Sequence, residues 1–324
     1  MNWWILASSL ILTVIGIIAH EFGHLAFGYL TGYRFSSFRL GALAWFKEDG
    51  RLRFTISKNW AAGQCVMVPA EEPENFKFVL YNLGGVIFNF LLSAMSFALV
   101  IIFSDDNIWE TIFIQSAAIN FLLALVNLVP VKAWTNDGAN ILEALKSKDA
   151  ARGLYMMFHV NNELSKGMRY RDFDKKLFKS DESAEVDNYL EAYLILFEAA
   201  RLEDSGEYDA FVECLKRINM KKMPGIIKSL IEADLLYYYT FYKLDHSKAR
   251  TIYKDKKLNK TLKMPLPGFA RIAAAYEFLV EKDIDKGQKL LEKGKRFTEN
   301  LPSKGQRIME MEYIQKLEDV VYGQ

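Results

Sequence analysis

Long apolar stretches alternate with short polar connections in the first part of the chain. No charged residue occurs in residues 1–19, 78–104 or 111–131. A helix rises about 1.5 Å per residue, so roughly 20 apolar residues cross a hydrocarbon core of about 30 Å. The pattern therefore predicts three membrane crossings, at about residues 3–32, 78–104 and 110–131.

A polar connection rich in strand-forming residues lies between the first two apolar stretches. Asp49-Gly50 interrupts it, and this dipeptide favours a tight turn. The flanking segments Leu43–Phe46 and Leu52–Ile56 predict a β-hairpin within residues 35–69, and Gln64–Val68 predicts a further short strand. An edge strand of this kind could align an extended peptide, whereas the alternative is a hairpin that only connects two helices.

Beyond the third apolar stretch the chain changes to short amphipathic blocks, which are typical of a soluble helical domain. Residues 146–185 are interpreted as a linker or helical connection, and residues 186–324 as a helical domain. Small residues recur there at intervals of 39 and 38 positions, at Ala210, Ala249 and Gly287. This spacing suits tetratricopeptide-like repeats, which would either bind a cytosolic protein partner or stabilise the rest of the chain.

The charge pattern predicts an orientation in the membrane. The formal net charge is only +1, so nothing indicates a nucleic acid partner. The connection after the first crossing carries Arg34, Arg39, Lys47, Arg51, Arg53, Lys58 and Lys77. The next connection has Asp105 and Asp106 and no basic residue. By the positive-inside rule we expect a multi-pass cell-membrane protein with its N-terminus outside and its C-terminal domain in the cytoplasm.

An HExxH motif follows directly on the first uncharged stretch, as His20-Glu21-Phe22-Gly23-His24. Residues four apart share one helix face, so His20 and His24 could bind one Zn²⁺. Glu21 could act as general base toward a metal-activated water. Ionisable groups at membrane depth are costly unless a metal or a polar cavity compensates them. The alternative is a helix that ends near Ala19 and leaves these groups at the membrane interface.

Two imidazoles leave zinc short of a third protein ligand, because catalytic zinc sites generally have three ligands and one open position. Asp137 is the best candidate. It follows Pro130, which would end or kink the third crossing, and it precedes Gly138, which would let the backbone turn sharply. The neighbouring Asn136 is a poorer zinc donor. Taken alone, Asp-Gly is more often an ordinary turn, so this assignment depends on the HExxH motif.

Together these motifs resemble the site-2 protease family of intramembrane zinc metalloproteases. The HExxH motif is joined by Asn127-x-x-Pro130 and Asp137-Gly138, and the pattern Gly85-x-x-x-Asn89 lies between them. The Pro that often follows the first Gly of that pattern is Val86 here. The resemblance covers about residues 1–145.

The resemblance implies further roles for two asparagines. Asn89 and Asn127 would line the site and bind the substrate backbone or a developing oxyanion. For each of them, a hydrogen bond to a neighbouring helix is the alternative.

We therefore expect a mainly α, polytopic membrane protein with a three-helix metalloprotease core, a small β-hairpin element and a C-terminal tetratricopeptide-like helical domain. The expected activity is zinc-dependent intramembrane proteolysis of a membrane-embedded peptide or a single-span protein, as in regulated intramembrane proteolysis. The alternative is a catalytically inactive, membrane-anchored helical-repeat scaffold that recruits protein partners. An intact HExxH with a matching second motif favours the enzyme.

Overall fold

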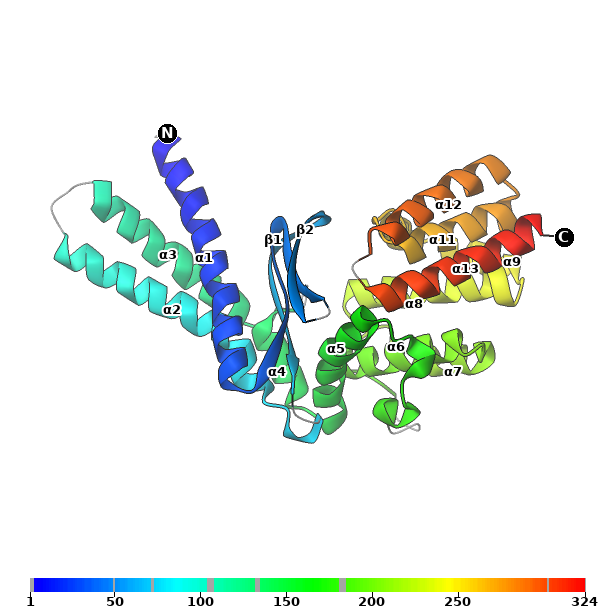
Figure 1. Cartoon of the computed structure of the whole chain (residues 1–324), viewed down its shortest axis with the longest axis horizontal. Helices are drawn as coiled ribbons and strands as arrows, with labels where there is room; N and C mark the ends of the chain where they lie inside the picture. The colour runs from blue at the N-terminus through cyan, green and yellow to red at the C-terminus, as the bar shows by residue number, and fades with distance from the viewer. Residues whose placement is uncertain are drawn as a thin grey trace. The chain divides into compact units, whose positions relative to one another are not determined.

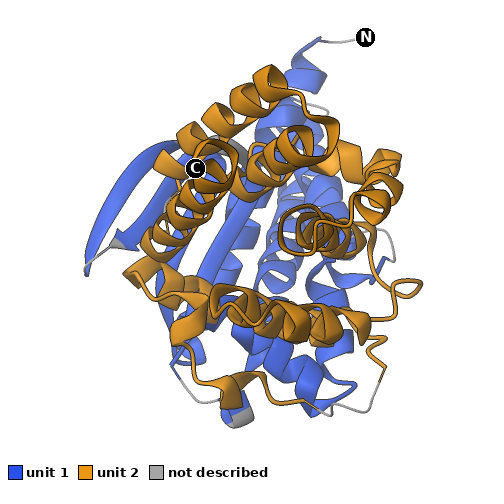
Figure 2. Ribbon diagram, turned by 90° about the vertical axis from the view of Figure 1, so that its right-hand side faces the viewer, with its two compact units in different colours: residues 1–159 blue, residues 160–324 orange. Residues whose placement is uncertain are grey.

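The computed structural model describes residues 3–48, 50–70, 73–103, 108–131, 135–180, 185–301 and 303–323. The chain is mainly helical and forms two compact units, residues 1–159 and 160–324 (Figures 1 and 2). The boundary between the units falls inside helix α5 (Lys148–Lys166). The predicted domain limits at 145 and 185 stay predictions.

Three long helices make up the apolar part of the first unit: α1 (Trp3–Leu30), α2 (Phe78–Ile102) and α3 (Ile108–Leu128). Each is long and apolar enough to cross a membrane. They pack against one another, yet many large apolar side chains face outward, and Leu10 and Ile102 are each 69% exposed. An exterior of this kind suits lipid rather than water, which supports membrane association.

Glycines bring α1 and α2 into backbone contact. A Cβ on Gly23 would lie 2.2 Å from the carbonyl oxygen of Gly84, and a Cβ on Gly84 would lie 2.4 Å from that of Gly23. No side chain fits in either place. Small residues at helix contacts are typical of membrane bundles, where close packing replaces the hydrophobic effect. The HExxH segment of α1 is thereby held against the first half of α2.

The predicted hairpin is confirmed as two long antiparallel strands, β1 (Tyr33–Glu48) and β2 (Arg51–Pro69). Residue 49 of the expected turn lies outside the described residues. The separate short strand expected at Gln64–Val68 is wrong, because this segment is the far end of β2. It pairs with β1 near the end of α1, so one hairpin spans the whole connection.

Two shorter helices follow the bundle. Helix α3 ends two residues before Pro130, in agreement with the expected break. Helix α4 (Asp137–Ala144) then begins, and α5 follows it. Asp137 therefore stands in the first turn of a helix rather than in a loop before one.

The second unit consists of helices joined by short turns. After two 3₁₀ turns (Tyr170–Asp172 and Lys175–Phe178) come α6 (Tyr189–Asp204), α7 (Tyr208–Lys216), α8 (Gly225–Tyr237), α9 (His246–Tyr253), α10 (Lys256–Thr261), α11 (Pro267–Tyr276), α12 (Ile284–Glu299) and α13 (Lys304–Tyr322). Packing is pairwise: α6 contacts α7, α8 contacts α9, and α11 contacts α12.

Two helices of this unit end in the same way, 39 residues apart. Helices α8 and α11 each end in a π-helical turn, at Tyr238–Tyr242 and Glu277–Glu281, and these turns start 39 positions apart. Of the small residues that recur in the sequence, Ala249 and Gly287 are buried between helices, but Ala210 is exposed. Only two of the three are therefore packing positions.

Gly287 tests this packing. A Cβ there would lie 2.5 Å from the Phe278 ring, whereas nothing lies within 4 Å of a Cβ on Gly225. We expect Gly287→Ala to lower the free energy of unfolding by about 1–3 kcal/mol, because overpacking forces the ring aside. Gly225→Ala, the control, should leave it within about 0.5 kcal/mol. Pulse proteolysis of the full chain in detergent would measure both, and equal stabilities would contradict the packing.

Candidate metal centre

The structure brings together the three predicted metal ligands. His20 and His24 share one face of α1, and Asp137 reaches them from the first turn of α4. The two histidine Nε2 atoms lie 3.2 Å apart. The Asp137 Oδ2 atom lies 3.1 Å from the His20 Nε2 and 3.4 Å from the His24 Nε2. These side chains come from segments more than 100 residues apart in sequence, and they could hold one metal ion.

The spacing of these atoms fits zinc. Zinc bonds to nitrogen and oxygen are about 2.0–2.1 Å long, so two ligand atoms of a tetrahedral site lie about 3.3 Å apart. The three separations, 3.1, 3.2 and 3.4 Å, bracket that value. Three protein ligands also leave a fourth position, as a catalytic site requires.

A main-chain contact determines the tautomer of His24. Its Nδ1 lies 2.8 Å from the carbonyl oxygen of Tyr81, which can only accept a hydrogen bond. The Nδ1 atom must therefore carry the proton, and the Nε2 lone pair of the neutral ring is left to face the site.

A chain of amides does the same for His20. The His20 Nδ1 lies 2.7 Å from the Asn89 Oδ1. The Nδ2 of Asn89 donates to the carbonyl oxygen of Gly16 and to the Oδ1 of Asn120, each at 2.9 Å. Asn120 in turn donates to the carbonyl oxygen of Ser116. Because these acceptors orient the Asn89 amide, its oxygen faces His20, and the His20 Nδ1 must be the donor.

The Nε2 atoms of His20 and His24 and the Oδ2 atom of Asp137 are consequently three acceptors in contact, and none of them carries a proton. Two imidazole lone pairs and one carboxylate oxygen repel one another, and a divalent cation at their centre converts this repulsion into attraction. A proton on one imidazole would instead make an ion pair with Asp137. Both arrangements place positive charge at this point, and the paired Nδ1 contacts favour the metal.

Asp137 is delivered to the site by its two neighbours in sequence. The Asn136 side chain caps α4 by accepting from the Ala139 N–H. Its Nδ2 also donates to the carbonyl oxygens of Val126 and Val129 at the end of α3, each at 2.7 Å. One side chain thus joins the end of one helix to the start of the next, as an N-cap can do where carbonyls are unpaired.

The expected role of Gly138 is corrected. Its φ is not positive, so the backbone makes no glycine-specific turn there. A Cβ on Gly138 would instead lie 1.8 Å from the carbonyl oxygen of Leu128. Glycine is required because α4 begins in direct contact with the end of α3. This contact sets the position of Asp137.

Glu21 lies between α1 and the hairpin. It is buried, and its carboxylate interacts electrostatically with His20, His24 and Asp137. On the other side it faces strand β2, near the main chain of Gly63 and Cys65. Gly63 of the same strand passes so close that a Cβ there would lie 2.7 Å from the Glu21 Oε1. A buried carboxylate beside the three ligands has the place that a general base needs.

The two asparagines expected at the site have different surroundings. Asn89 is fully buried, and both of its Nδ2 hydrogens are used in helix contacts. Asn127 is half-buried and donates to the carbonyl oxygen of Leu123, within its own helix. Their roles in substrate binding remain predictions. The contact that Asn89 makes orients His20, one of the three candidate ligands.

Sequence reasoning missed Asn120 and Tyr81. A signal existed for Asn120, because an amide in the uncharged stretch 111–131 must find a partner inside the membrane. No signal existed for Tyr81, since it acts on His24 through its main chain.

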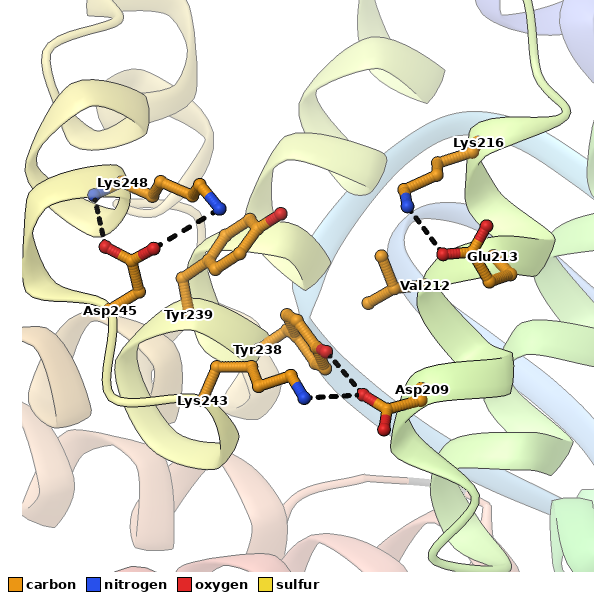
Figure 3. Close-up of a pocket in the computed structure, with 9 residues that line it drawn as sticks. All are labelled: Asp209, Val212, Glu213, Lys216, Tyr238, Tyr239, Lys243, Asp245 and Lys248. Atoms are coloured by element: carbon orange, nitrogen blue, oxygen red, sulfur yellow. Dashed lines mark hydrogen bonds and ion pairs between the residues drawn. The ribbon is translucent and has the colours of Figure 1, made fainter.

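The second unit contains a hollow of about 500 Å³ with a different character (Figure 3). It is lined by three lysines, three carboxylates, two tyrosines and Val212. Each lysine is paired with a carboxylate: Lys216 with Glu213 at 2.5 Å, Lys243 with Asp209 at 2.9 Å, and Lys248 with Asp245 at 3.3 Å. The hydrogen bond from Lys243 lowers the pKa of Asp209. These pairs neutralise one another, so the hollow is a solvated ion-pair surface.

The fold and the site define a membrane-associated helical protein in which apolar helices surround a buried cluster of metal-ligand type. Residues 8–115 match the family model described as peptidase family M50, which is the family of the site-2 proteases. The resemblance recognised from the motifs is thereby confirmed. The match includes the HExxH motif and Asn89 and ends before Asn127 and Asp137. No curated protein and no solved structure matches the chain.

The orienting role of Asn89 can be tested by Asn89→Leu, which keeps the side-chain shape but removes the acceptor for His20. We expect the zinc affinity to fall about 10–100-fold, the usual effect of losing the partner of a ligating histidine. Ser93→Ala is the matched control, because Ser93 lies one turn further along α2 and bonds only to the carbonyl oxygen of Ala117 among the contacts described. Competition with a chromogenic chelator measures both affinities. An unchanged affinity in Asn89→Leu would contradict the role.

Proposed function

We propose that this protein is a zinc-dependent intramembrane protease that hydrolyses a membrane-embedded peptide or a single-span membrane protein. One observation carries the proposal. Two imidazoles and a carboxylate converge at zinc-like separations inside a bundle of apolar helices, with both Nδ1 atoms held as donors elsewhere. Such a set is costly in an apolar bundle unless it binds a cation. The match to peptidase family M50, whose members are zinc-dependent in general, supports the same conclusion.

His20, His24 and Asp137 would hold the zinc, which when bound would polarise the scissile carbonyl and activate water. Glu21 would act as the base that accepts the proton of the attacking water, and then as the acid that donates it to the leaving amine. Burial suits both steps, because few water molecules compete for the carboxylate. The contact with β2 at Gly63 would keep the carboxylate oriented during both proton transfers.

The hairpin would present the substrate. A peptide bond inside a helix is shielded, so a membrane-spanning substrate must unwind before hydrolysis. Strand β2 runs directly past Glu21, at Gly63 and Cys65. An unwound segment that paired with this strand by β-augmentation would lie beside the general base. Asn127 is proposed to contact the substrate backbone, as the family resemblance implies. Asn89 is fully buried with its amide atoms already bonded, so it is proposed to orient His20 instead.

The orientation and the partner are part of the proposal. The basic residues between α1 and α2 support a cytoplasmic hairpin and a cytoplasmic second unit, with the N-terminus outside. The paired helices of the second unit support a tetratricopeptide-like domain, because such repeats stack helix pairs. A cytosolic partner, or the cytosolic tail of the substrate, would bind to this domain.

The proposal is tested by Glu21→Gln and His24→Ala in the full-length protein purified in detergent. Glu21→Gln should retain stoichiometric zinc but lose at least about a hundredfold in cleavage, because the base is gone while the ligands remain. His24→Ala should lose both. His246→Ala, which removes a histidine from the start of α9, is the control and should change neither. The zinc content of each purified protein is measured by elemental analysis. Cleavage is measured in cells, by comparing the membrane peptides of cells that contain the wild-type protein with those of cells that contain Glu21→Gln.

Two results would reject the enzyme. Stoichiometric zinc in a His20→Ala, His24→Ala double variant would place the metal elsewhere. Identical membrane peptides in cells with wild-type protein and with Glu21→Gln would favour the inactive scaffold that recruits protein partners.

A further inference from the structure

One tyrosine contacts both sides of the metal centre. Tyr81 lies in the first turn of α2 and is buried, with its ring stacked on Tyr33 at 4.7 Å between centroids. Its main-chain carbonyl accepts the Nδ1 proton of His24. Its side-chain hydroxyl points to the hairpin instead and donates to the carbonyl oxygen of Cys65 at 2.9 Å.

Strand β2 links this hydroxyl to Glu21. In an antiparallel strand the N–H and the C=O of one residue point to the same edge. At Cys65 this edge faces the helices, because the C=O accepts from Tyr81 of α2. The N–H therefore points to the same side, where Glu21 of α1 lies against Gly63 of the strand. The strand is further anchored two residues on. Met67 is fully buried, and its sulfur packs against Gly28 of α1, where a Cβ would lie only 2.2 Å from it.

The hydroxyl is the part of this chain of contacts that holds the strand in place. Without it, the Cys65 carbonyl would be left buried and unpaired, which costs about 1–3 kcal/mol unless the strand shifts toward another donor. A shift of β2 also moves the main chain at Gly63, against which the Glu21 carboxylate packs. His24 is unaffected by loss of the hydroxyl, because its contact is with the main chain.

We propose that Tyr81 is a positioning residue that orients His24 through its carbonyl and Glu21 through its hydroxyl and strand β2. The inference rests on the proposed function, since it concerns how the base is aimed. It predicts that the two roles can be separated by mutation. Loss of the hydroxyl should change the orientation of Glu21 and leave the metal affinity unchanged. A merely structural tyrosine would affect both together.

Tyr81→Phe removes the hydroxyl and nothing else. The probes are Co²⁺, which replaces zinc and absorbs visible light, and acetohydroxamate, which chelates a metal and releases a proton that an adjacent carboxylate can accept. In full-length protein in detergent, we expect the Co²⁺ affinity of Tyr81→Phe to stay within about twofold of wild type. The acetohydroxamate affinity should fall about three- to tenfold, the effect of one hydrogen bond. Tyr33→Phe, which removes a hydroxyl from the stacked ring and leaves the Tyr81–Cys65 bond in place, should change neither.

A double-mutant cycle separates positioning from general destabilisation. If Tyr81 acts through Glu21, then adding Tyr81→Phe to Glu21→Gln has no further effect on acetohydroxamate affinity. Additive losses would overturn the inference, as would a wild-type affinity in Tyr81→Phe or an equal loss of Co²⁺ binding. Failure of wild-type protein to bind Co²⁺ would reject the proposed function itself. It is therefore distinguishable from failure of the inference, which appears only as a difference between variants.

Discussion

The need to satisfy polar atoms inside an apolar bundle governs the first unit of this protein. Little water reaches an imidazole, an amide or a carboxylate buried among apolar helices, so each must find a partner in the protein or a cation. The histidines meet this need on one side, where Nδ1 donates to Asn89 or to the Tyr81 carbonyl. On the other side their lone pairs face Asp137. Most other features of the site keep these contacts in place.

These polar contacts depend on helices whose backbones approach one another closely. Gly23 and Gly84 allow α1 to touch α2, and Gly138 allows α4 to begin against the carbonyl of Leu128. Gly85 lies under the His20 ring, where a Cβ would come within 2.5 Å of it. Helix packing and the arrangement of the three candidate ligands therefore depend on the same glycines. A methyl group at any of these positions would move a ligand as well as a helix.

The hairpin contacts the helices of the first unit through main-chain atoms at the edge of β2. Cys65 turns its C=O to Tyr81, and Glu21 lies against Gly63 of the same strand, so a strand that looks like a connection is part of the site. The second unit has a different physical basis. Its apolar side chains gather in a buried core between helices, and the lysines at its hollow are paired with acids.

The sequence by itself determined the features that depend on short-range spacing. Uncharged stretches marked the three long helices, Asp49-Gly50 between strand formers marked the hairpin, and the i, i+4 spacing of His20 and His24 put both imidazoles on one helix face. The tertiary structure alone decided which polar groups meet. Asn120 and Tyr81 reach the site because α2 and α3 pack on α1, where Gly23 lies against Gly84 and Gly16 lies against Asn120. Likewise, the need for glycine at position 138 comes from contact with a carbonyl ten residues earlier, which no local pattern encodes.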